Sequence, residues 1–435
     1  MLLHSTNNPA HKKLFAQAIV DAYPPDKGLY IPDTIEPMST GFFKKLPGLS
    51  FPEMAFLISR HLLADEIPLN ELERICHLAF DFEVPLVPLT ADTSVLELFH
   101  GPTLAFKDFG ARFMAMVLQY VARNAPRRII VLTATSGDTG GAVASGFLGV
   151  ENVDVVILYP EGKVSDMQRR QLTTMGENIR ALAVEGTFDD CQRLVKEAFL
   201  EPSLQSKYQL CSANSINIGR LIPQSFYYFY GCSRLDDMSQ APLISIPSGN
   251  YGNLTAGLLA KRMGLPVKQF IAASNENDVF PEYLTTGTFR PRASLETHSS
   301  AMDVGNPSNF SRILDLYQHD LPALGRDITG YRISDEETAE TIARLFVSQQ
   351  YIMDPHTAVG YLALERYRIQ TGDHSSPGMV LSTAHAAKFA GLVEKQTGRP
   401  VEIPIRLSSL LQKTEIFTRV EATLPALQSF LEANF

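Results

Sequence analysis

The sequence predicts an α/β protein whose parallel sheets are covered by helices, together with a separate N-terminal domain. From about residue 90 onward, short apolar runs rich in β-branched residues alternate with longer amphipathic stretches, a pattern typical of parallel strands joined by helical crossovers. Before that point, helical periodicity is interrupted by proline-rich segments. We therefore expect an N-terminal domain over residues 1–90 and a core over residues 91–435.

Two stretches of the N-terminal region carry helical periodicity, Phe51–Leu63 and Leu69–Phe80. They lie between proline-rich segments that begin at Tyr23 and at Val84. Proline lacks a backbone donor and interrupts regular structure, so these two segments are expected to be connections. The N-terminal domain is therefore predicted to contain both helices.

The core contains six short apolar runs that are predicted to be strands. They are Ile129–Thr133, Val153–Leu158, Ile179–Val184, Leu243–Ile246, Phe270–Ala273 and Met379–Ser382. No internal repeat or extended linker separates them, so we expect tight crossovers between closely packed lobes. The final stretch, Leu407–Phe435, is largely amphipathic and is expected to pack as a closing helical segment.

Composition excludes several classes of protein. The formal net charge of −9, from 38 basic and 47 acidic residues without a long run of either sign, argues against a nucleic-acid partner. No apolar run approaches the roughly 18 residues of a membrane span. The start of the chain does not resemble a secretory signal, so we expect a cytoplasmic protein without a membrane partner. The four cysteines are widely spaced, which predicts reduced core residues and no metal site.

Three of the predicted strands are followed by loops of small residues that could bind anions. These loops are Ala134-Thr-Ser-Gly-Asp-Thr-Gly-Gly, Ser248-Gly-Asn-Tyr-Gly-Asn and Thr383-Ala-His. Each precedes a helical pattern, so backbone N–H groups and a helix N-terminus are expected at the carboxyl edge of a sheet. None has the glycine spacing of a nucleotide P-loop or of a dinucleotide site, which disfavours nucleotide chemistry.

Lys107 lies just before a strongly amphipathic run, Phe109–Val121, and is therefore expected at the start of a helix. Two interpretations are open. It could be an exposed lysine paired with Asp108, because surface pairs of this kind are common. Alternatively, its apolar and aromatic flanks could desolvate the ammonium and lower its pKa toward the neutral amine that a Schiff base requires.

The segment His100-Gly-Pro-Thr-Leu-Ala-Phe-Lys-Asp-Phe-Gly resembles the pyridoxal-lysine signature of the threonine synthase family. Five further blocks of the sequence resemble blocks of that family and follow one another in the family's order. They are Ala134–Gly140, Ser212–Arg220, Pro247–Asn253, Ala301–Asn309 and Ser382–Phe389. The likeness extends from Gly28-Leu-Tyr-Ile-Pro to the last predicted strand. It is greatest to the bacterial and fungal branch, which has an added N-terminal domain.

The resemblance implies the pyridoxal phosphate fold type II, which is like the tryptophan synthase β subunit, with two α/β lobes. It also implies a pyridoxal-phosphate-dependent carbon–oxygen lyase acting on phosphate. The expected reaction converts O-phospho-L-homoserine and water to L-threonine and phosphate by γ-elimination and β-addition, which is the last step of threonine biosynthesis. Because water must enter this reaction at a controlled point, a lobe around residues 110–180 is expected to move.

The same resemblance assigns the cofactor site. Lys107 would hold pyridoxal 5'-phosphate as a Schiff base and then transfer protons. The residues expected to surround the cofactor phosphate are Gly249, Asn250, Tyr251, Gly252 and Asn253. Thr383 would face the pyridine nitrogen, and Asp138 would lie near the 3-hydroxyl, where relatives of this fold often have asparagine.

The substrate positions follow in the same way. Thr135, Ser136 and Thr139 would hold the α-carboxylate. The leaving phosphate would be bound by Asn214, Ser215, Asn217 and Arg220. Lys163 is either a further phosphate ligand or a solvated loop lysine, and the histidines His100, His356 and His385 are expected to form structural hydrogen bonds.

Two other functions are compatible with parts of this pattern. A serine or threonine dehydratase would use the same lysine and phosphate loop, but it would leave the cluster ending at Arg220 without a phosphate to neutralise. A non-catalytic paralogue would have kept the fold alone. The sequence is compatible with a monomer and with a homodimer.

Overall fold

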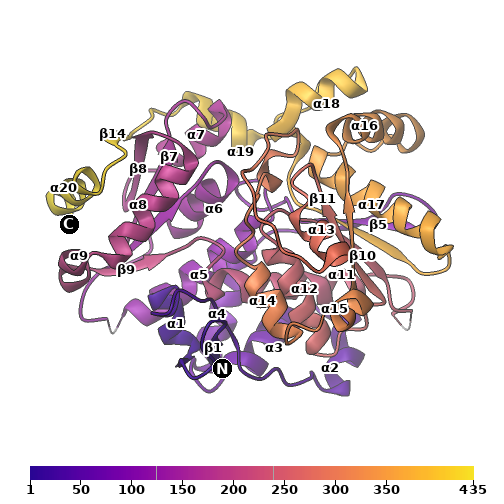
Figure 1. Ribbon diagram of the computed structural model, residues 1–435, viewed down its shortest axis with the longest axis horizontal. Coiled ribbons are helices and arrows are strands. Elements are labelled where there is room, and N and C mark those ends of the chain that lie inside the picture. The colour runs from indigo at the N-terminus through magenta and orange to yellow at the C-terminus, as the bar shows by residue number, and fades with distance from the viewer. Residues whose placement is uncertain (124, 239) are drawn as a thin grey trace.

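The computed structural model describes residues 1–123, 125–238 and 240–435. Two α/β lobes lie side by side above the N-terminal region, and the chain ends on the outer side of the smaller lobe (Figure 1). The predicted arrangement of two lobes with parallel sheets is confirmed. No helix among the described residues is both long and apolar enough to cross a membrane.

The N-terminal region combines a small antiparallel sheet with four α-helices. The sheet has the order β2-β1-β3, with β1 at Leu2–Ser5, β2 at Lys12–Leu14 and β3 at Tyr30–Pro32. The helices are α1 (Phe15–Asp21), α2 (Thr40–Lys45), α3 (Phe51–Leu63) and α4 (Leu69–Ala79). Both predicted helices are confirmed. A capping box between Ser50 and Glu53 fixes the start of α3.

This region shares its hydrophobic core with the rest of the chain. The Phe51 and Phe80 rings contact the ring of Phe109 on α5 (Lys107–Ala122), with centroid separations of 5.2 and 5.9 Å. Aromatic contacts of this kind bury much apolar area and restrain the relative orientation of the elements. The N-terminal region therefore supports the helix that begins at Lys107.

The smaller lobe contains a five-stranded, entirely parallel sheet with the order β14-β8-β7-β6-β9. The strands are β6 (Ile129–Ala134), β7 (Val153–Pro160), β8 (Ile179–Glu185), β9 (Gln209–Ser212) and β14 (Thr418–Glu421). Its helices include α6 (Asp138–Phe147), α7 (Asp166–Thr173) and α8 (Phe188–Leu200). Every residue of β6 and β7 is buried, as expected for strands covered on both faces.

The larger lobe contains a six-stranded sheet with the order β12-β11-β10-β13-β5-β4, in which β4 alone is antiparallel. The strands are β4 (Leu86–Pro88), β5 (Thr93–Glu97), β10 (Leu243–Pro247), β11 (Gln269–Ser274), β12 (Ile328–Arg332) and β13 (Gly378–Ser382). Helices that pack around it include α12 (Gly252–Arg262), α16 (Asp335–Gln349) and α17 (Pro355–Thr371). All six predicted strands are present in the two sheets.

The prediction that Leu407–Phe435 packs as a closing helical segment is wrong in part. The segment contains α19 (Ile405–Ser408) and α20 (Leu424–Asn434), but β14 lies between them. β14 pairs in parallel with β8 at the edge of the smaller sheet. An edge strand leaves backbone donors and acceptors unpaired, and the returning chain satisfies them. Four residues are too few to show a clear periodicity in the sequence.

Candidate active site

The parallel order of the larger sheet brings three loops to one edge. β13 lies between β10 and β5, so the segments that follow these strands meet at their carboxyl ends. The backbone N–H of Phe106 donates to the carbonyl of Thr383 at 2.9 Å. Lys107 is the first residue of α5, as predicted. It is therefore anchored next to Thr383, at the edge where open α/β sheets bind ligands.

The environment of Lys107 lowers the pKa of its amine to about 8, with desolvation by the surrounding protein as the largest cause. The charge of Asp138 opposes this shift, whereas those of Arg220 and Lys388 reinforce it. The residue as a whole is half-buried, so a ligand can reach it although its amine is poorly solvated. A lysine in this state is suited to act as a nucleophile and a base near neutral pH.

Asp108 does not pair with Lys107. Its carboxylate accepts hydrogen bonds from the Thr103 N–H at 2.9 Å and from the Thr103 hydroxyl at 2.7 Å. A Cβ atom on Gly101 would lie 2.4 Å from the Asp108 carboxylate, so glycine is required there. Asp108 is fully buried, which raises its pKa to about 6. The alternative of an exposed Lys107–Asp108 pair is therefore wrong.

The loop after β10 closes tightly at the start of α12. Asn253 donates to the carbonyl of Pro247 at 2.9 Å, and Tyr251 adopts a left-handed backbone conformation with φ of 55°. A Cβ atom on Gly249 would lie 2.6 Å from the Cα of Met302. Gly252 is the first residue of α12. The loop therefore presents backbone N–H groups at a helix N-terminus, which is a suitable place for a phosphate.

Asn250 connects this loop to the segment that contains Ser215. Its amide nitrogen donates to the hydroxyls of Ser215 and Ser308, and its amide oxygen accepts from the Ser308 N–H at 2.6 Å. The structure therefore brings together residues that the sequence assigned to the cofactor phosphate and to the leaving phosphate. Ser308 was not among the predicted site residues.

The two asparagines of the second predicted phosphate cluster have different environments. Asn214 bonds to both backbone groups of Ala134, donating to its carbonyl at 2.7 Å and accepting from its N–H at 3.2 Å. Asn217 is fully buried and donates to the carbonyls of Ile19 and Ser212 at 2.8 and 2.9 Å. The side-chain oxygen of Asn217 also accepts from the backbone N–H of Gly219, so the amide group already bonds to three backbone groups of the protein.

Arg220 is buried against the helix that Lys107 begins. A Cβ atom on Gly110 would lie 2.8 Å from its Nε and 2.7 Å from its carbonyl oxygen, so glycine permits this approach. The guanidinium donates to the carbonyl of Ala213, but its Nε is buried without a partner among the described residues. Burial lowers its pKa to about 10. An anion beside this group would satisfy an otherwise costly buried donor.

The loop after β6 contains the residues that were predicted to bind the α-carboxylate, together with Asp138. The Thr135 hydroxyl donates to the carbonyl of Gly137 at 2.9 Å and accepts from the N–H groups of Gly137 and Gly140 at 3.0 and 2.9 Å. It therefore shapes the turn itself. Ser136 is exposed and Thr139 is half-buried. Asp138 begins α6 and is almost fully buried.

Sequence reasoning did not assign a role to Lys388, which contacts Asp138. Its ammonium lies 2.7 Å from the Asp138 carboxylate, and both side chains are almost completely buried. Gln168, at the start of α7, also donates to Asp138 at 3.2 Å. Lys388 belongs to one of the blocks that carried the family resemblance, but its partner could not be deduced from sequence spacing.

Arg312, on α14 (Phe310–Leu316), was also missed. It is fully buried and donates to the carbonyls of Tyr30, Ser215 and Ile216 at 2.9, 3.1 and 2.6 Å. A fourth bond reaches the side-chain oxygen of Asn309 at 2.7 Å, and burial lowers the pKa of the guanidinium to about 9. Arg312 thus joins the N-terminal region to the backbone around Ser215.

Replacing Arg312 with methionine is expected to lower the free energy of unfolding by about 3–5 kcal/mol, because several buried oxygens would lose their donor. Urea-induced unfolding followed by circular dichroism measures this loss. Arg399→Met, at an exposed position, is a matched control that should leave stability nearly unchanged. Equal stability of Arg312→Met and Arg399→Met would contradict the assignment.

The histidines and Lys163 lie in ordinary structural environments. His100 bonds to Glu97 at 2.7 Å, His356 bonds to Asp354 at 2.7 Å, and His385 accepts from the backbone two residues later at 3.1 Å. The expectation of structural hydrogen bonds is confirmed for all three. Lys163 is exposed. Within residues 1–123, 125–238 and 240–435, no group of three potential metal ligands occurs.

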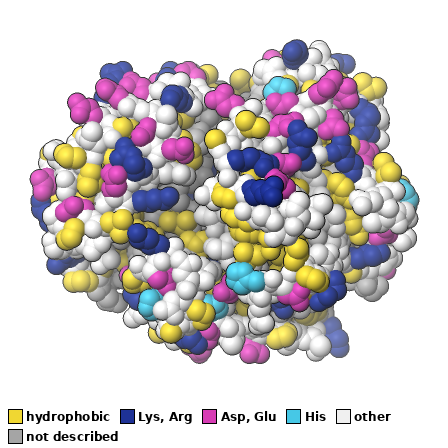
Figure 2. All heavy atoms as spheres, in the orientation of Figure 1, with side chains coloured by type: hydrophobic (Ala, Val, Ile, Leu, Met, Phe, Trp, Pro, Cys, Tyr) yellow, Lys and Arg dark blue, Asp and Glu magenta, His cyan; other side chains and the backbone are white. Residues whose placement is uncertain are grey.

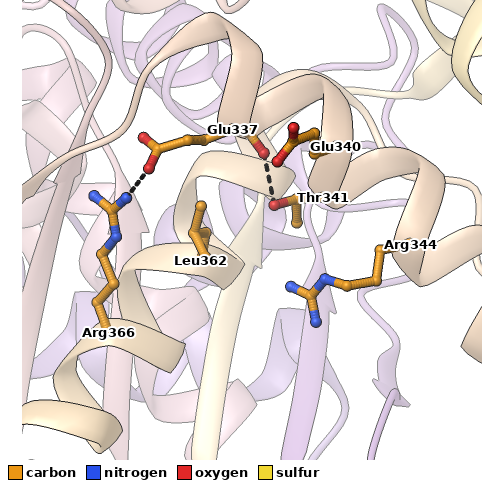
Figure 3. Close-up of a pocket in the computed structure, with 6 residues that line it drawn as sticks. All are labelled: Glu337, Glu340, Thr341, Arg344, Leu362 and Arg366. Carbon is orange, nitrogen blue, oxygen red and sulfur yellow. Dashed lines mark hydrogen bonds and ion pairs between the residues drawn. The ribbon is translucent and has the colours of Figure 1, made fainter.

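The surface outside this region is mixed in charge. Figure 2 shows acidic and basic side chains interspersed over both lobes on the face in view. A surface pocket between α16 and α17 contains an ion pair between Arg366 and Glu337 (Figure 3). Arg344, which also lines it, pairs with Glu365. None of the predicted site residues lines this pocket, and its charges largely neutralise one another.

Lys107 at the start of α5, the loop before α12 and the backbone of Thr383 lie at one edge of the larger sheet, where open α/β proteins bind phosphate-bearing ligands. The family model for pyridoxal-phosphate-dependent enzymes matches residues 92–383. The N-terminal threonine synthase model matches residues 3–80, and the C-terminal one matches residues 357–431. The protein is a member of the pyridoxal-phosphate-dependent enzymes.

Similarity to individual proteins identifies the family within that class. The chain is 42% identical to threonine synthase of Escherichia coli, over all of this chain and 97% of the relative. The crystal structure of threonine synthase from Escherichia coli matches with a TM-score of 0.92 and 40% identity, covering both chains completely. That of the pyridoxal-phosphate-bound enzyme from Brucella melitensis matches with a TM-score of 0.93 and 34% identity, covering 100% and 99%. The chain belongs to the threonine synthase family.

Proposed function

We propose that this protein converts O-phospho-L-homoserine and water to L-threonine and phosphate with the help of pyridoxal phosphate. The observation that carries this proposal is that two candidate anion-binding segments meet beside the helix that begins at Lys107, through the hydrogen bond from Asn250 to Ser215 and the close approach of Arg220 to Gly110. One is the loop from Gly249 to Asn253, and the other is the segment that ends at Arg220. A lyase that removes a phosphate group from its substrate needs both a cofactor phosphate site and a second site for the leaving group.

The residues present fit pyridoxal phosphate. The N–H groups at the start of α12 would hold its phosphate, Lys107 would bind its aldehyde carbon, and Thr383 would face its ring nitrogen. The fit rests on the helix N-terminus that begins at Gly252 and on the lowered pKa of Lys107. When bound, the cofactor supplies the electron sink for charge that develops next to the amino group, which side chains alone do not provide.

The protein's own residues would bind the substrate and move its protons. Lys107 would take protons from the substrate carbons and return them. Arg220 and Ser215 would hold the leaving phosphate, with its charge offset by the guanidinium. Ser136 and Thr139 would bind the α-carboxylate at the start of α6.

Three residues from the predicted substrate set would act indirectly. Thr135 and Asn217 have side chains committed to the backbone, so they would shape the loops that hold the substrate. Asn214 would link the phosphate segment to the end of β6 through its two bonds to Ala134. We further propose that residues 1–90 form the N-terminal domain and that the lobe around residues 110–180 closes over the substrate.

The deciding experiment compares two substrates. Phosphate release from O-phospho-L-homoserine and ammonia release from serine are measured with the same preparation. We expect rapid phosphate release with formation of threonine, and little ammonia. Turnover of serine alone would instead support the dehydratase, and no turnover of either substrate would support a non-catalytic paralogue.

The state of the cysteines supports a cytoplasmic location for this reaction. Cys76, Cys191, Cys211 and Cys232 are all buried and unbonded to one another. Disulfides are rare in reducing compartments, where thiols of this kind persist.

A further inference from the structure

A buried ion pair connects the two lobes beside Lys107. Lys388 lies in the short 3-10 helix Ala386–Phe389, which follows β13 in the larger lobe. Asp138 begins α6 in the smaller lobe. The two charged groups are 2.7 Å apart, and their side chains are 1% and 3% exposed. A pair buried to this extent interacts with little screening by solvent.

Lys388 also contacts the segment that leads to Lys107. Its ammonium donates to the carbonyl of Thr103 at 2.9 Å. The N–H and hydroxyl of Thr103 in turn donate to the carboxylate of Asp108. Gln171, on α7, donates to the Thr103 carbonyl as well, at 3.2 Å. Lys388 is therefore bound both to the start of α6 and to the segment that precedes α5.

The charges around Lys107 act in opposite directions. The charged groups that affect it are Asp138 on α6, Arg220 on α10 (Ile218–Leu221) and Lys388. Asp138 favours the ammonium form, while the two cations favour the neutral amine. Burial raises the pKa of the Asp138 carboxyl. The positive charge of Lys388 and, to a lesser extent, that of Lys107 lower it, and the pKa is about 2. Asp138 is therefore an ionised carboxylate that pairs with Lys388 and also interacts electrostatically with Lys107.

We propose that Lys388 is a positioning residue that acts through Asp138. By holding the carboxylate, it keeps Asp138 from pairing fully with Lys107, and it ties the start of α6 to the segment that carries Lys107. This inference rests on the proposed function, because that function gives the neutral amine of Lys107 its task. Without Lys388, the buried carboxylate would have Lys107 as its nearby lysine partner.

The test measures how readily Lys107 captures pyridoxal phosphate at different pH values. Cofactor-free protein is mixed with pyridoxal phosphate, and the growth of visible absorbance gives the rate of attachment. The wild-type rate is expected to rise with a midpoint near the Lys107 pKa of about 8, because only the neutral amine attacks the aldehyde. This measurement does not depend on turnover.

Lys388→Met is expected to raise that midpoint by about one pH unit or more, since an opposite charge nearby favours the ammonium form. The rate of attachment at neutral pH should fall about tenfold for each pH unit by which the midpoint rises. Lys388→Gln keeps a hydrogen-bond donor but no charge, and its midpoint should rise equally. Lys395→Met, at an exposed position on α18 (Ala390–Thr397), is the matched control and should behave like the wild type.

A double variant separates charge from structure. In Lys388→Met combined with Asp138→Asn, the carboxylate that would hold Lys107 is gone, so the midpoint should return to the wild-type value or below. Lys388→Arg restores the cation and should also bring the midpoint back. A purely structural role would lower the unfolding temperature of the variants and leave the midpoint unchanged.

An unchanged midpoint in both Lys388→Met and Lys388→Gln would overturn the proposal. Failure of the proposed function has a different signature, because the wild type itself would then form no adduct at Lys107. Borohydride reduction and peptide mapping of the wild type, carried out first, distinguish the two outcomes.

Discussion

Lys107→Arg is expected to lower the rate of phosphate release from O-phospho-L-homoserine by about a hundredfold to ten-thousandfold, which is the range for loss of a general acid–base group. Arginine keeps a positive charge at the start of α5, but its guanidinium remains protonated and cannot attack an aldehyde. Covalent attachment of the cofactor should therefore be lost as well. Activity is measured as phosphate release, and attachment by borohydride reduction followed by peptide mapping.

The control for this variant is Lys196→Arg, an exposed position on α8. It carries the same chemical change far along the chain from Lys107 and should leave both readouts unchanged. A pyridoxyl group found on another lysine, with turnover preserved in Lys107→Arg, would contradict the assignment.

Arg220→Lys is expected to lower kcat/KM for the phosphorylated substrate by about a hundredfold, because hydrogen bonds to charged groups contribute about 1.5–3 kcal/mol each. Lysine keeps the charge but lacks the planar pair of donors that engages a phosphate. The cofactor is expected to bind normally, since the loop from Gly249 to Asn253 is unchanged. Steady-state phosphate release, together with the absorbance of the bound cofactor, separates these two effects.

Arg399→Lys, at an exposed position, is the matched control for this substitution. A structural role for Arg220 predicts a different pattern, in which cofactor binding and the unfolding temperature fall together while KM stays the same. That pattern would remove Arg220 from the substrate site. Loss of substrate affinity in a well-folded protein that still binds the cofactor would support the assignment.

Local sequence patterns predicted most of the elements that build the site. The strand β6 was found because its residues are mostly apolar and rich in β-branched side chains, which is the pattern of a strand covered on both faces. Lys107 was placed at a helix start because the periodic residues begin at Phe109. In contrast, β14 is short, exposed and formed only by pairing with β8, so its sequence carries little signal.

The sequence by itself determined the fold class and the order along the chain of Lys107, Arg220 and the three loops of small residues that are suited to anions. Only the tertiary structure decided which of these side chains have donors or acceptors left for a ligand. Asn217 commits its amide to Ile19 and Ser212, whereas Arg220 keeps a buried Nε without a partner among the described residues. Hydrogen-bond partners of this kind come from distant parts of the chain.

The same distinction holds for Lys107. Local context showed that Lys107 begins a helix with apolar flanks, which predicts the direction in which its pKa moves. The packing of two lobes then placed Asp138, Arg220 and Lys388 close enough to set the balance of charge around it. Electrostatic interactions depend on separation in space and on burial, and neither follows from separation along the chain.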